Sequence, residues 1–409
     1  MSFAELWESL LPIGRDPGTG GYRRFSWTDA DRRCRDWFVR AATCRGLPVE
    51  HDHDGNLWAW WDTVPQGGVS RTGAVAAGSH LDSVPDGGAF DGPLGIVSAF
   101  AAIDSLRARG FVPARPVAVV AFTEEEGARF GVACLGSRLL TGAVAAGTAR
   151  GLRDCAGVTL AEAMAAAGAR PDRLGPDDDL PRRVAAYVEL HIEQGRQLAA
   201  LDAVIGVGEG IWPHGRWRFD FSGRADHAGT TALADRRDPM LPFAVTVLAA
   251  RQAAGHHGAL ATFGKLSVVP GGVNAIGSAA HAWLDARAPD DGILERMTGE
   301  ITAAADRAGA EHGVTVTVTR ESFSPAVEFD PALRARAEAA LARRAIKAAR
   351  VRTGAGHDAG VLAARIPTAM LFVRNPSGVS HAPGEHADPA DCATGVAALA
   401  AVLGELAGT

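Results

Sequence analysis

Apolar residues along this chain form two kinds of pattern, short continuous runs and runs at helical spacing. The continuous runs at 74–77 and 116–122 are typical of strands buried on both faces of a parallel sheet. A helix start rich in small residues follows the first run, from Gly92 to Phe100, and an amphipathic helix is predicted at the end of the chain, at about 389–407. Strands that alternate with helices in this way predict an α/β domain, with a mixed, mostly parallel sheet flanked by helices.

The first quarter of the chain predicts a helix and a hairpin ahead of the run at 74–77. Apolar residues at helical spacing lie between a capping residue, Thr28, and a terminating glycine, Gly46. The turn Asp54-Gly55-Asn56 precedes an aromatic strand at 57–61. We therefore expect the first strands to form a hairpin.

The pattern changes from about residue 206, where aromatic residues begin to alternate with charged ones. The segment 216–221 predicts an antiparallel strand with one exposed face, which suits a sheet edge or an interface. Helical patterns near 237–254 and 292–309 alternate with strands near 261–269, 280–287 and 313–319. These elements predict an inserted α+β domain.

The first pattern returns after roughly residue 325, with a predicted helix at 331–349 and a buried strand at 368–373. We therefore expect one domain to comprise residues 1–210 and 325–409, and the inserted domain to comprise residues 211–324.

Composition narrows the class of partner. The net charge of -6, with 22% charged residues, argues against nucleic acid or an anionic membrane as partner and favours a small or polar substrate. A leader peptide and a continuous apolar run of about 18 residues are both absent from the sequence, so we expect a cytoplasmic protein without a membrane span. The five cysteines are scattered and lack CxxC spacing, so we expect them to be reduced thiols and poor candidates for metal ligands.

Candidate chemistry begins where the run at 74–77 ends, at Gly78-Ser79-His80. A strand here delivers His80 to the carboxyl edge of the sheet, where open α/β sheets bind their ligands. Asp82 lies two residues on, on the same side of an extended chain, where a carboxylate can orient a ligating imidazole. A glycine-rich loop then brings back Asp91. Taken alone, the stretch also fits a core histidine between a strand and a helix.

Further candidates follow other predicted strands. Glu124, Glu125 and Glu126 follow the run at 116–122, and like charges crowded there raise one another's pKa unless a cation neutralises them. Histidines also follow two more strands, as His191 and His381. Imidazole and carboxylate donors without thiolate suit two divalent ions, zinc or manganese, with cobalt or nickel also compatible. Two such ions about 3.5–4 Å apart can share a hydroxide and bind a carbonyl oxygen.

Eight motifs, which span nearly the whole chain, carry a family resemblance. They are, in order, GSHLDSVPDGGAFDG, TEEEGARF, ELHIEQG, DHAGTT, GGVNAI, LDAR, GAGHDA and SHAPGE. The series resembles the allantoate amidohydrolase and N-carbamoyl-L-amino-acid amidohydrolase branch of the two-metal aminoacylase-like hydrolases. The resemblance implies cleavage of a linear amide C–N bond by a metal-bridging hydroxide, with Glu125 as general base.

The resemblance also implies roles for individual residues. One metal would be held by His80, Asp91 and His191, and the other by Asp91, Glu126 and His381, so that Asp91 bridges the two ions. The inserted domain would be a lid and dimerisation module, with His227 acting in trans on the oxyanion in the partner subunit of a homodimer. Asn274 and Arg287, on neighbouring lid strands, would hold the substrate's α-carboxylate, and Gln194 and His357 would line the pocket.

Two departures leave the substrate open. The family usually has glutamine where this chain has His214, which we count among the substrate-binding candidates, and proline where it has Ala232. Allantoate and N-carbamoyl-L-amino acids are the expected substrates, and N-formyl- or N-acyl-L-amino acids are the alternative. The series HIEQG disfavours a dipeptidase, and a non-catalytic binding relative would be expected to have lost the base or a ligand.

Overall fold

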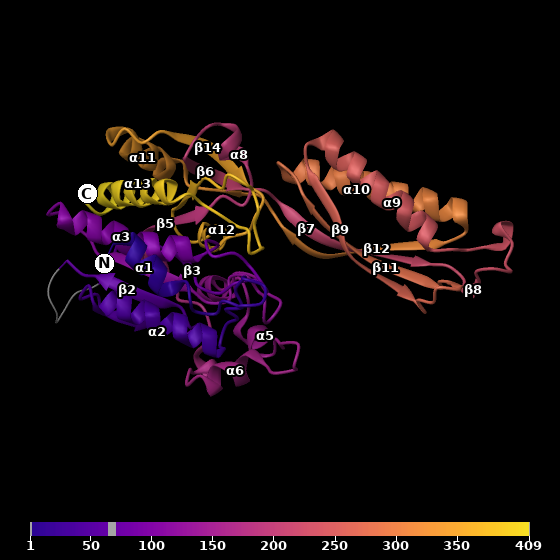
Figure 1. Ribbon diagram of the computed structural model, residues 1–409, viewed down its shortest axis with the longest axis horizontal. Helices are drawn as coiled ribbons and strands as arrows, with labels where there is room; N and C mark the ends of the chain where they lie inside the picture. The colour runs from indigo at the N-terminus through magenta and orange to yellow at the C-terminus, as the bar shows by residue number, and fades with distance from the viewer. Residues whose placement is uncertain (1, 64–70, 409) are drawn as a thin grey trace. The chain divides into compact units, whose positions relative to one another are not determined.

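The computed structural model describes residues 2–63 and 71–408 of the chain (Figure 1). It divides into two compact units. Unit 1 comprises Met1–Gly210 and Glu328–Thr409, and unit 2 comprises Ile211–Val327. Each unit has its own hydrophobic core.

Unit 1 contains a large mixed sheet with helices on both faces. Its helices are α1 (Phe3–Leu10), α2 (Asp29–Thr43), α3 (Pro93–Ala108), α4 (Leu135–Thr141), α5 (Ala146–Arg150), α6 (Leu160–Ala166), η1 (Pro171–Arg173), α7 (Leu180–Arg183), α8 (Gln197–Ala200), α11 (Pro331–Arg343), α12 (Asp358–Leu362) and α13 (Pro389–Ala407). Its strands are β1 (Val49–His51), β2 (Leu57–Trp61), β3 (Ala74–His80), β4 (Val117–Phe122), β5 (Val184–Ile192), β6 (Ile205–Ile211), β13 (Val327–Glu328), β14 (Ala348–Thr353) and β15 (Thr368–Val373).

The strand order within the described residues is β1-β2-β4-β3-β5-β15-β6-β13, and β14 also pairs with β6. The four central strands β4, β3, β5 and β15 are parallel, whereas β1 and β2 form an antiparallel hairpin and β6 runs antiparallel to β15. The predicted α/β class, the mixed sheet and the hairpin are therefore confirmed. Because the central strands are parallel, their carboxyl ends meet at one edge of the sheet.

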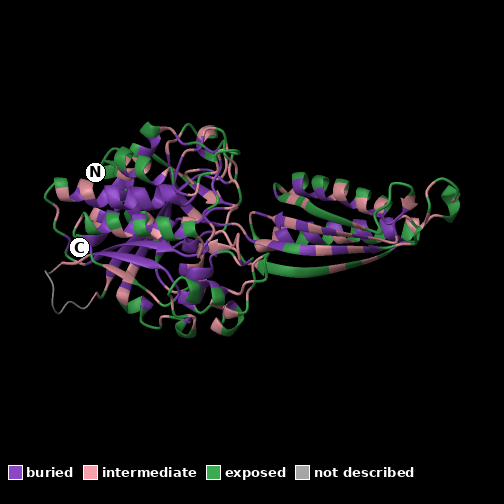
Figure 2. Ribbon diagram, turned by 60° about the horizontal axis from the view of Figure 1, so that its bottom comes forward, coloured by how far each residue is buried: buried purple, intermediate pink, exposed green. Residues whose placement is uncertain are grey.

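The two faces of this sheet have different partners. Side chains of one face, such as Val75 and Val188, join a core with α1, α2, α3, α11 and α13. The other face carries Tyr187, Glu189 and His191, and α12 packs there beside α4. Figure 2 shows buried central strands beneath helices whose outer surfaces are exposed. α13 is long and apolar enough to span a membrane, but 61% of its most apolar window is buried in this core.

Unit 2 is a two-layer α+β unit. Its helices are η2 (Leu233–Asp235), α9 (Met240–His257) and α10 (Asp291–His312), and its strands are β7 (His214–Ser222), β8 (Asp226–His227), β9 (Leu260–Val269), β10 (Ala275–Ile276), β11 (Ala279–Arg287) and β12 (Thr315–Ser324). The main sheet has the order β12-β7-β11-β9, and β8 pairs with β10. Trp217, Phe219 and Phe221 pack under the helices, while the charged residues between them lie on the opposite face.

Two predicted elements differ from the structure. The predicted strand at 216–221 is not at an edge, because β7 lies between β12 and β11. The predicted helix at 331–349 ends at Arg343, and strand β14 begins at Ala348. A run of alanine and arginine suits a helix by propensity, but pairing with β6 overrides that preference for the last residues.

Candidate metal centre

Two parallel strands bring the first pair of histidines together. His80 is the last residue of β3, and His191 is the penultimate residue of β5. Alternation along each strand places both side chains on the α12 side of the sheet. Both residues are buried, and their ring centroids are 5.9 Å apart.

Asp91 reaches these histidines from the loop before α3. Its Oδ1 lies 3.4 Å from Nε2 of His80 and 3.2 Å from Nε2 of His191. The next residue, Gly92, has φ of +82°, and a Cβ there would lie 2.5 Å from the His80 ring. The loop can therefore pass this close to the imidazole only with glycine at that position.

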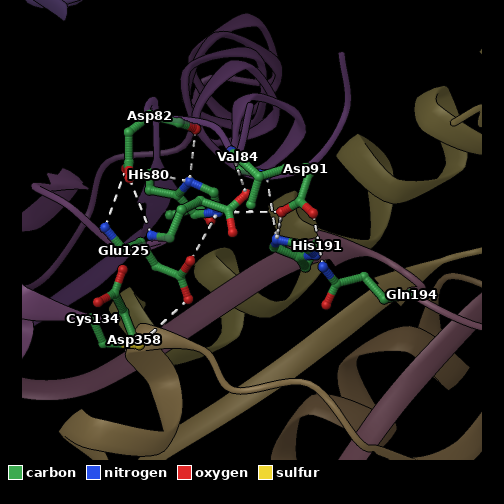
Figure 3. Close-up of polar contacts among 12 residues, drawn as sticks. His80, Asp82, Val84, Asp91, Glu125, Cys134, His191, Gln194 and Asp358 are labelled. Atoms are coloured by element: carbon green, nitrogen blue, oxygen red, sulfur yellow. Dashed lines mark hydrogen bonds and ion pairs between the residues drawn. The ribbon is translucent and has the colours of Figure 1, made fainter. Parts of the chain in front are cut away.

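The second oxygen of Asp91 faces another pair of donors. Oδ2 lies 3.4 Å from Nε2 of His381, which in turn lies 3.6 Å from Oε2 of Glu126. One carboxylate thus presents one oxygen to His80 and His191 and the other to His381, as a bridge between two ligand clusters. Figure 3 shows Asp91 beside His191 and Gln194. The expected metal ligands therefore lie together around Asp91.

These residues fit two divalent cations. Nε2 of His80 is buried without a hydrogen-bond partner among the described residues. Burial and the neighbouring Asp91 carboxylate raise the pKa of Glu126 to about 7. Burial and Asp91 likewise raise the pKa of Glu385 to about 7. Crowded buried carboxylates need positive charge nearby, and a set of nitrogen and oxygen donors suits zinc-class ions.

Glu125 lies at the edge of the first cluster. It is buried, and its Oε2 is 3.7 Å from Nε2 of His80. Burial raises the pKa of Glu125 well above its usual range, although the His80 charge opposes this. The thiol of Cys134 donates a hydrogen bond of 3.4 Å to the other oxygen, Oε1. Glu125 is thus a fixed carboxyl group with a raised proton affinity.

Asp82 contacts more of the site than the imidazole it was expected to orient. Its carbonyl oxygen is 3.2 Å from Nδ1 of His80, and its Oδ1 is 3.5 Å from the same nitrogen. In addition, its carboxylate accepts the backbone N–H groups of Glu125 at 3.2 Å and of Glu126 at 3.1 Å. Figure 3 shows Asp82 beside both His80 and Glu125. One carboxylate therefore holds the loop that carries both glutamates.

The two residues expected to line the pocket also lie at this cluster. Nε2 of Gln194 donates to Oδ2 of Asp91 at 2.7 Å. The His357 ring is buried with its centroid 4.5 Å from that of His191. Burial and the nearby His191 lower the pKa of His357 well below its usual range, so this ring is neutral.

Three supporting carboxylates were not identified from the sequence. Glu385 accepts the backbone N–H groups of Phe90 and Asp91, both at 2.9 Å, and so holds the bridging loop. Glu189 accepts the Ser79 hydroxyl at 2.7 Å. The third, Asp358, accepts the hydroxyl of Ser137 in α4. Each of the three lies within a quoted motif, Glu189 in ELHIEQG, Asp358 in GAGHDA and Glu385 in SHAPGE, and these motifs gave the only signal for them.

The remaining candidates lie in unit 2 and form two groups. His214 begins β7 and is paired with Arg287, the last residue of β11, whose Nε donates to Asp285 at 2.9 Å. His227 and Asn274 lie together, because β8 pairs with β10 and the Asn274 carbonyl accepts the N–H of the residue after His227.

Asn274 and Arg287 lie at opposite ends of β11 in one chain, since Asn274 precedes the Ala279 end. That strand has 9 residues. Its ends are therefore roughly 26 Å apart at the usual rise of about 3.3 Å per residue. Within one chain, neighbouring strands therefore do not bring these two side chains together, and their shared role in holding the substrate's carboxylate stays a prediction.

The imidazole of His227 is oriented by its own turn. Its Nδ1 accepts the backbone N–H groups of Gly229 at 3.0 Å and Thr230 at 3.1 Å. Because Nδ1 is an acceptor, the proton of the neutral ring is on Nε2. His227 is exposed, so Nε2 is presented outward as a hydrogen-bond donor.

Comparisons with known proteins agree with this arrangement. The model of peptidase family M20/M25/M40 matches residues 76–405. The chain is 37% identical over 407 residues to the N-carbamoyl-L-amino acid amidohydrolase of Geobacillus stearothermophilus, covering 98% of each chain. It is 32% identical over 413 residues to the allantoate amidohydrolase of Escherichia coli, covering 99% of this chain and 98% of that one.

A solved structure extends the agreement to the whole fold. The hydantoinase/carbamoylase family amidase from Burkholderia multivorans superposes with a TM-score of 0.88 at 32% identity, covering 100% of this chain and 98% of that one. The family match at residues 76–405 includes His80, Asp91, Glu125, Glu126, His191 and His381. This chain belongs to peptidase family M20/M25/M40, in its amidohydrolase branch.

Proposed function

We propose that this protein hydrolyses a linear amide C–N bond in a small ureido acid, either an N-carbamoyl-L-amino acid or allantoate. The observation that carries the proposal is the position of Glu125, a buried carboxyl group 3.7 Å from a ligand of the cluster that shares Asp91. The relatives named for these two substrates cover nearly the whole chain.

Some residues of the cluster would bind the metal ions, and Glu125 would transfer the proton. Two divalent cations held by the His80 and His381 sides of Asp91 would polarise the scissile carbonyl and make a water more acidic. Glu125 then takes the proton from the attacking water and returns it to the leaving nitrogen. Burial raises the pKa of Glu125 in the metal-free site, and two bound cations would lower that pKa so that the carboxylate can accept the proton of the water.

Zinc or manganese is the proposed native metal, with cobalt or nickel as further candidates. The donors are imidazole nitrogens and carboxylate oxygens, without thiolate. Cys134, the cysteine that contacts Glu125, has a pKa raised well above its usual range by burial and by Glu125, so it stays a neutral thiol. All five cysteines are free, which supports a cytoplasmic location.

The active form is proposed to be a homodimer in which unit 2 serves as the lid. One lid cannot bring Asn274 and Arg287 to the same carboxylate, since they lie at opposite ends of β11. If Asn274 and His227 enter the partner subunit's site while Arg287 serves the site of its own chain, each of the two sites contains all three residues. His227 would then donate its Nε2–H to the oxyanion that develops from the amide carbonyl.

Exposed apolar side chains on unit 2 support this assembly. α9 carries the exposed residues Leu241, Val245 and Leu248. The adjacent edge strand β9 carries the exposed residues Leu260 and Leu266. An edge strand with exposed apolar side chains is stabilised by a cover, and a second copy of the same strand provides one.

A mixed dimer tests action in trans. Chains carrying His227→Ala are combined with chains carrying Glu125→Gln, and turnover is compared with that of each parent dimer. Action in trans leaves one site of the mixed dimer with both groups intact, so we expect activity well above either parent. A mixed dimer no more active than its parents would show that His227 acts within its own chain.

The substrate is tested with metal-loaded protein and a panel of N-carbamoyl-, N-formyl- and N-acetyl-L-amino acids together with allantoate. Released ammonia and free amine are both measured. We expect turnover of a ureido compound with ammonia as a product. Turnover confined to the formyl or acetyl compounds, without release of ammonia, would favour an N-acyl-L-amino-acid amidohydrolase. In that case His214 and Ala232 would be the first residues to mutate.

A further inference from the structure

We propose that unit 2 binds an additional divalent cation, of the zinc class, between the C-terminal end of α9 and the middle of α10. The ligands would be His256, His257 and Glu300, whose nearest ligand atoms all lie within 4.8 Å of one another. None of these residues belongs to the cluster around Asp91, so the site is independent of the proposed activity.

The two histidines converge in an unusual way. They are the last two residues of α9, and adjacent residues of a helix normally project in different directions. Here the ring centroids are only 4.9 Å apart, with 37° between the ring planes. Gly258, with φ of +59°, ends the helix directly afterwards. Both rings can therefore turn toward Glu300.

Glu300 completes the group from the neighbouring helix. Its Oε1 lies 2.9 Å from Nε2 of His257, whose side chain is only 14% exposed. His256 and Glu300 also line a hollow of about 400 Å³ between α9 and α10. Small residues, including Ala253 and Ala304, form part of the lining. Water can reach His256 and Glu300 there and supply a further ligand.

The chemistry of the group favours a zinc-class ion. Two imidazoles and one carboxylate are the protein ligands of many open zinc sites, whereas magnesium and calcium prefer oxygen donors. The C-terminal end of an 18-residue helix carries partial negative charge, which stabilises a cation. Arg307 lines the same hollow and opposes a second positive charge, so we expect weaker binding than at the cluster around Asp91.

The same unit provides a matched control. Nδ1 of His281 in β11 lies 2.5 Å from Oδ1 of Asp220 in β7, a histidine–carboxylate pair of the same kind. No second histidine joins this pair in the candidate metal groups of the described residues. His281→Ala therefore removes a histidine–carboxylate contact without removing the proposed site.

The test counts zinc by equilibrium dialysis and elemental analysis of the full-length protein, its variants and the His281→Ala control. We expect wild type and His281→Ala to bind one zinc ion per chain more than the double variant His256→Ala/His257→Ala. Glu300→Gln should weaken this extra binding by at least about tenfold, since even residues that only orient a ligand cost 10–100-fold. Zinc should also raise the thermal unfolding temperature of wild type more than that of the double variant.

Two results would overturn the proposal. Equal zinc counts for wild type and double variant would show that the three side chains hold no ion. Loss of the extra ion in His281→Ala as well would show that it is bound non-specifically. Unchanged turnover by the double variant would establish that this variant is folded. If none of the substrates in the panel were hydrolysed, the zinc count would still test the proposed site.

Discussion

Asp82→Asn is the most informative change near the cluster, because it alters charge with almost no change in shape. The carboxylate is 4% exposed, and its two oxygens accept the N–H groups of Glu125 and Glu126 at 3.2 and 3.1 Å. In the variant, the amide nitrogen must face one of these N–H donors. One glutamate therefore loses its backbone anchor, and a buried donor is left without an acceptor.

The size of the effect follows from the loss of one hydrogen bond to a charged group. Such a bond is worth about 1.5–3 kcal/mol. That corresponds to about 10- to 150-fold in metal affinity or turnover, depending on which glutamate moves. We expect the loss to divide between kcat and metal affinity and to leave substrate KM nearly unchanged, because Asp82 contacts the glutamate loop and His80.

The assay measures bound metal after dialysis, and kcat at saturating metal, for Asp82→Asn and Asp54→Asn. Asp54 is an equally buried carboxyl group that accepts a single N–H, from Gly175 at 3.0 Å. Burial and the neighbouring Asp52 raise its pKa to about 8, so it is already protonated at neutral pH and should tolerate the change. An Asp82→Asn variant that matched Asp54→Asn in both measurements would refute the anchoring role.

Three further predictions concern metal, substrate and pH. His80→Ala and His381→Ala should each lower the bound metal measured by elemental analysis, since each removes a donor of one cluster; full occupancy of both ions in both variants would contradict the ligand assignment. Arg287→Lys should raise KM for α-carboxylate substrates by about 10- to 150-fold. For a substrate amidated at that carboxylate, KM should be the same with the wild type and with Arg287→Lys. If the effects of the mutation and of the amidation on KM simply multiplied, Arg287 would hold something other than this carboxylate. Metal-free protein should lose stability as pH rises from about 4.5 to about 7 in thermal unfolding, because burial raises the pKa of both Glu126 and Glu385 to about 7 and favours their protonated forms in the folded state; a rise in stability over that range would contradict this.

The strand ends were predictable from the sequence because they follow a local rule. Continuous apolar runs marked β3 and β4, and the polar residues directly after them had to lie at the carboxyl edge of a parallel sheet. Residue spacing alone left His80 as either a ligand or a core histidine. The structure brings it to Asp91, in the loop that follows its strand, and to His191, which is remote in sequence.

The supporting contacts were not predictable because they join distant segments. Glu385 reaches the N–H of Asp91 across 294 residues of sequence, and Glu189 reaches Ser79 across 110. The separation of Asn274 from Arg287 likewise depends on the direction of β11 and its pairing, which residue types do not specify. Short local signals predict elements, while these partners depend on the register of the sheet.

Glu125→Gln tests the central claim most directly, with Glu124→Gln as its matched control. Glu124 is the adjacent buried glutamate, but its Oε1 only accepts the N–H groups of Arg129 and Phe130, which a glutamine oxygen can also accept. In metal-loaded protein acting on an N-carbamoyl-L-amino acid, Glu125→Gln should keep its metal while kcat falls by about 10²–10⁴-fold. Glu124→Gln should stay near wild type. A Glu125→Gln variant that retained more than about a tenth of wild-type kcat would contradict Glu125 as the general base.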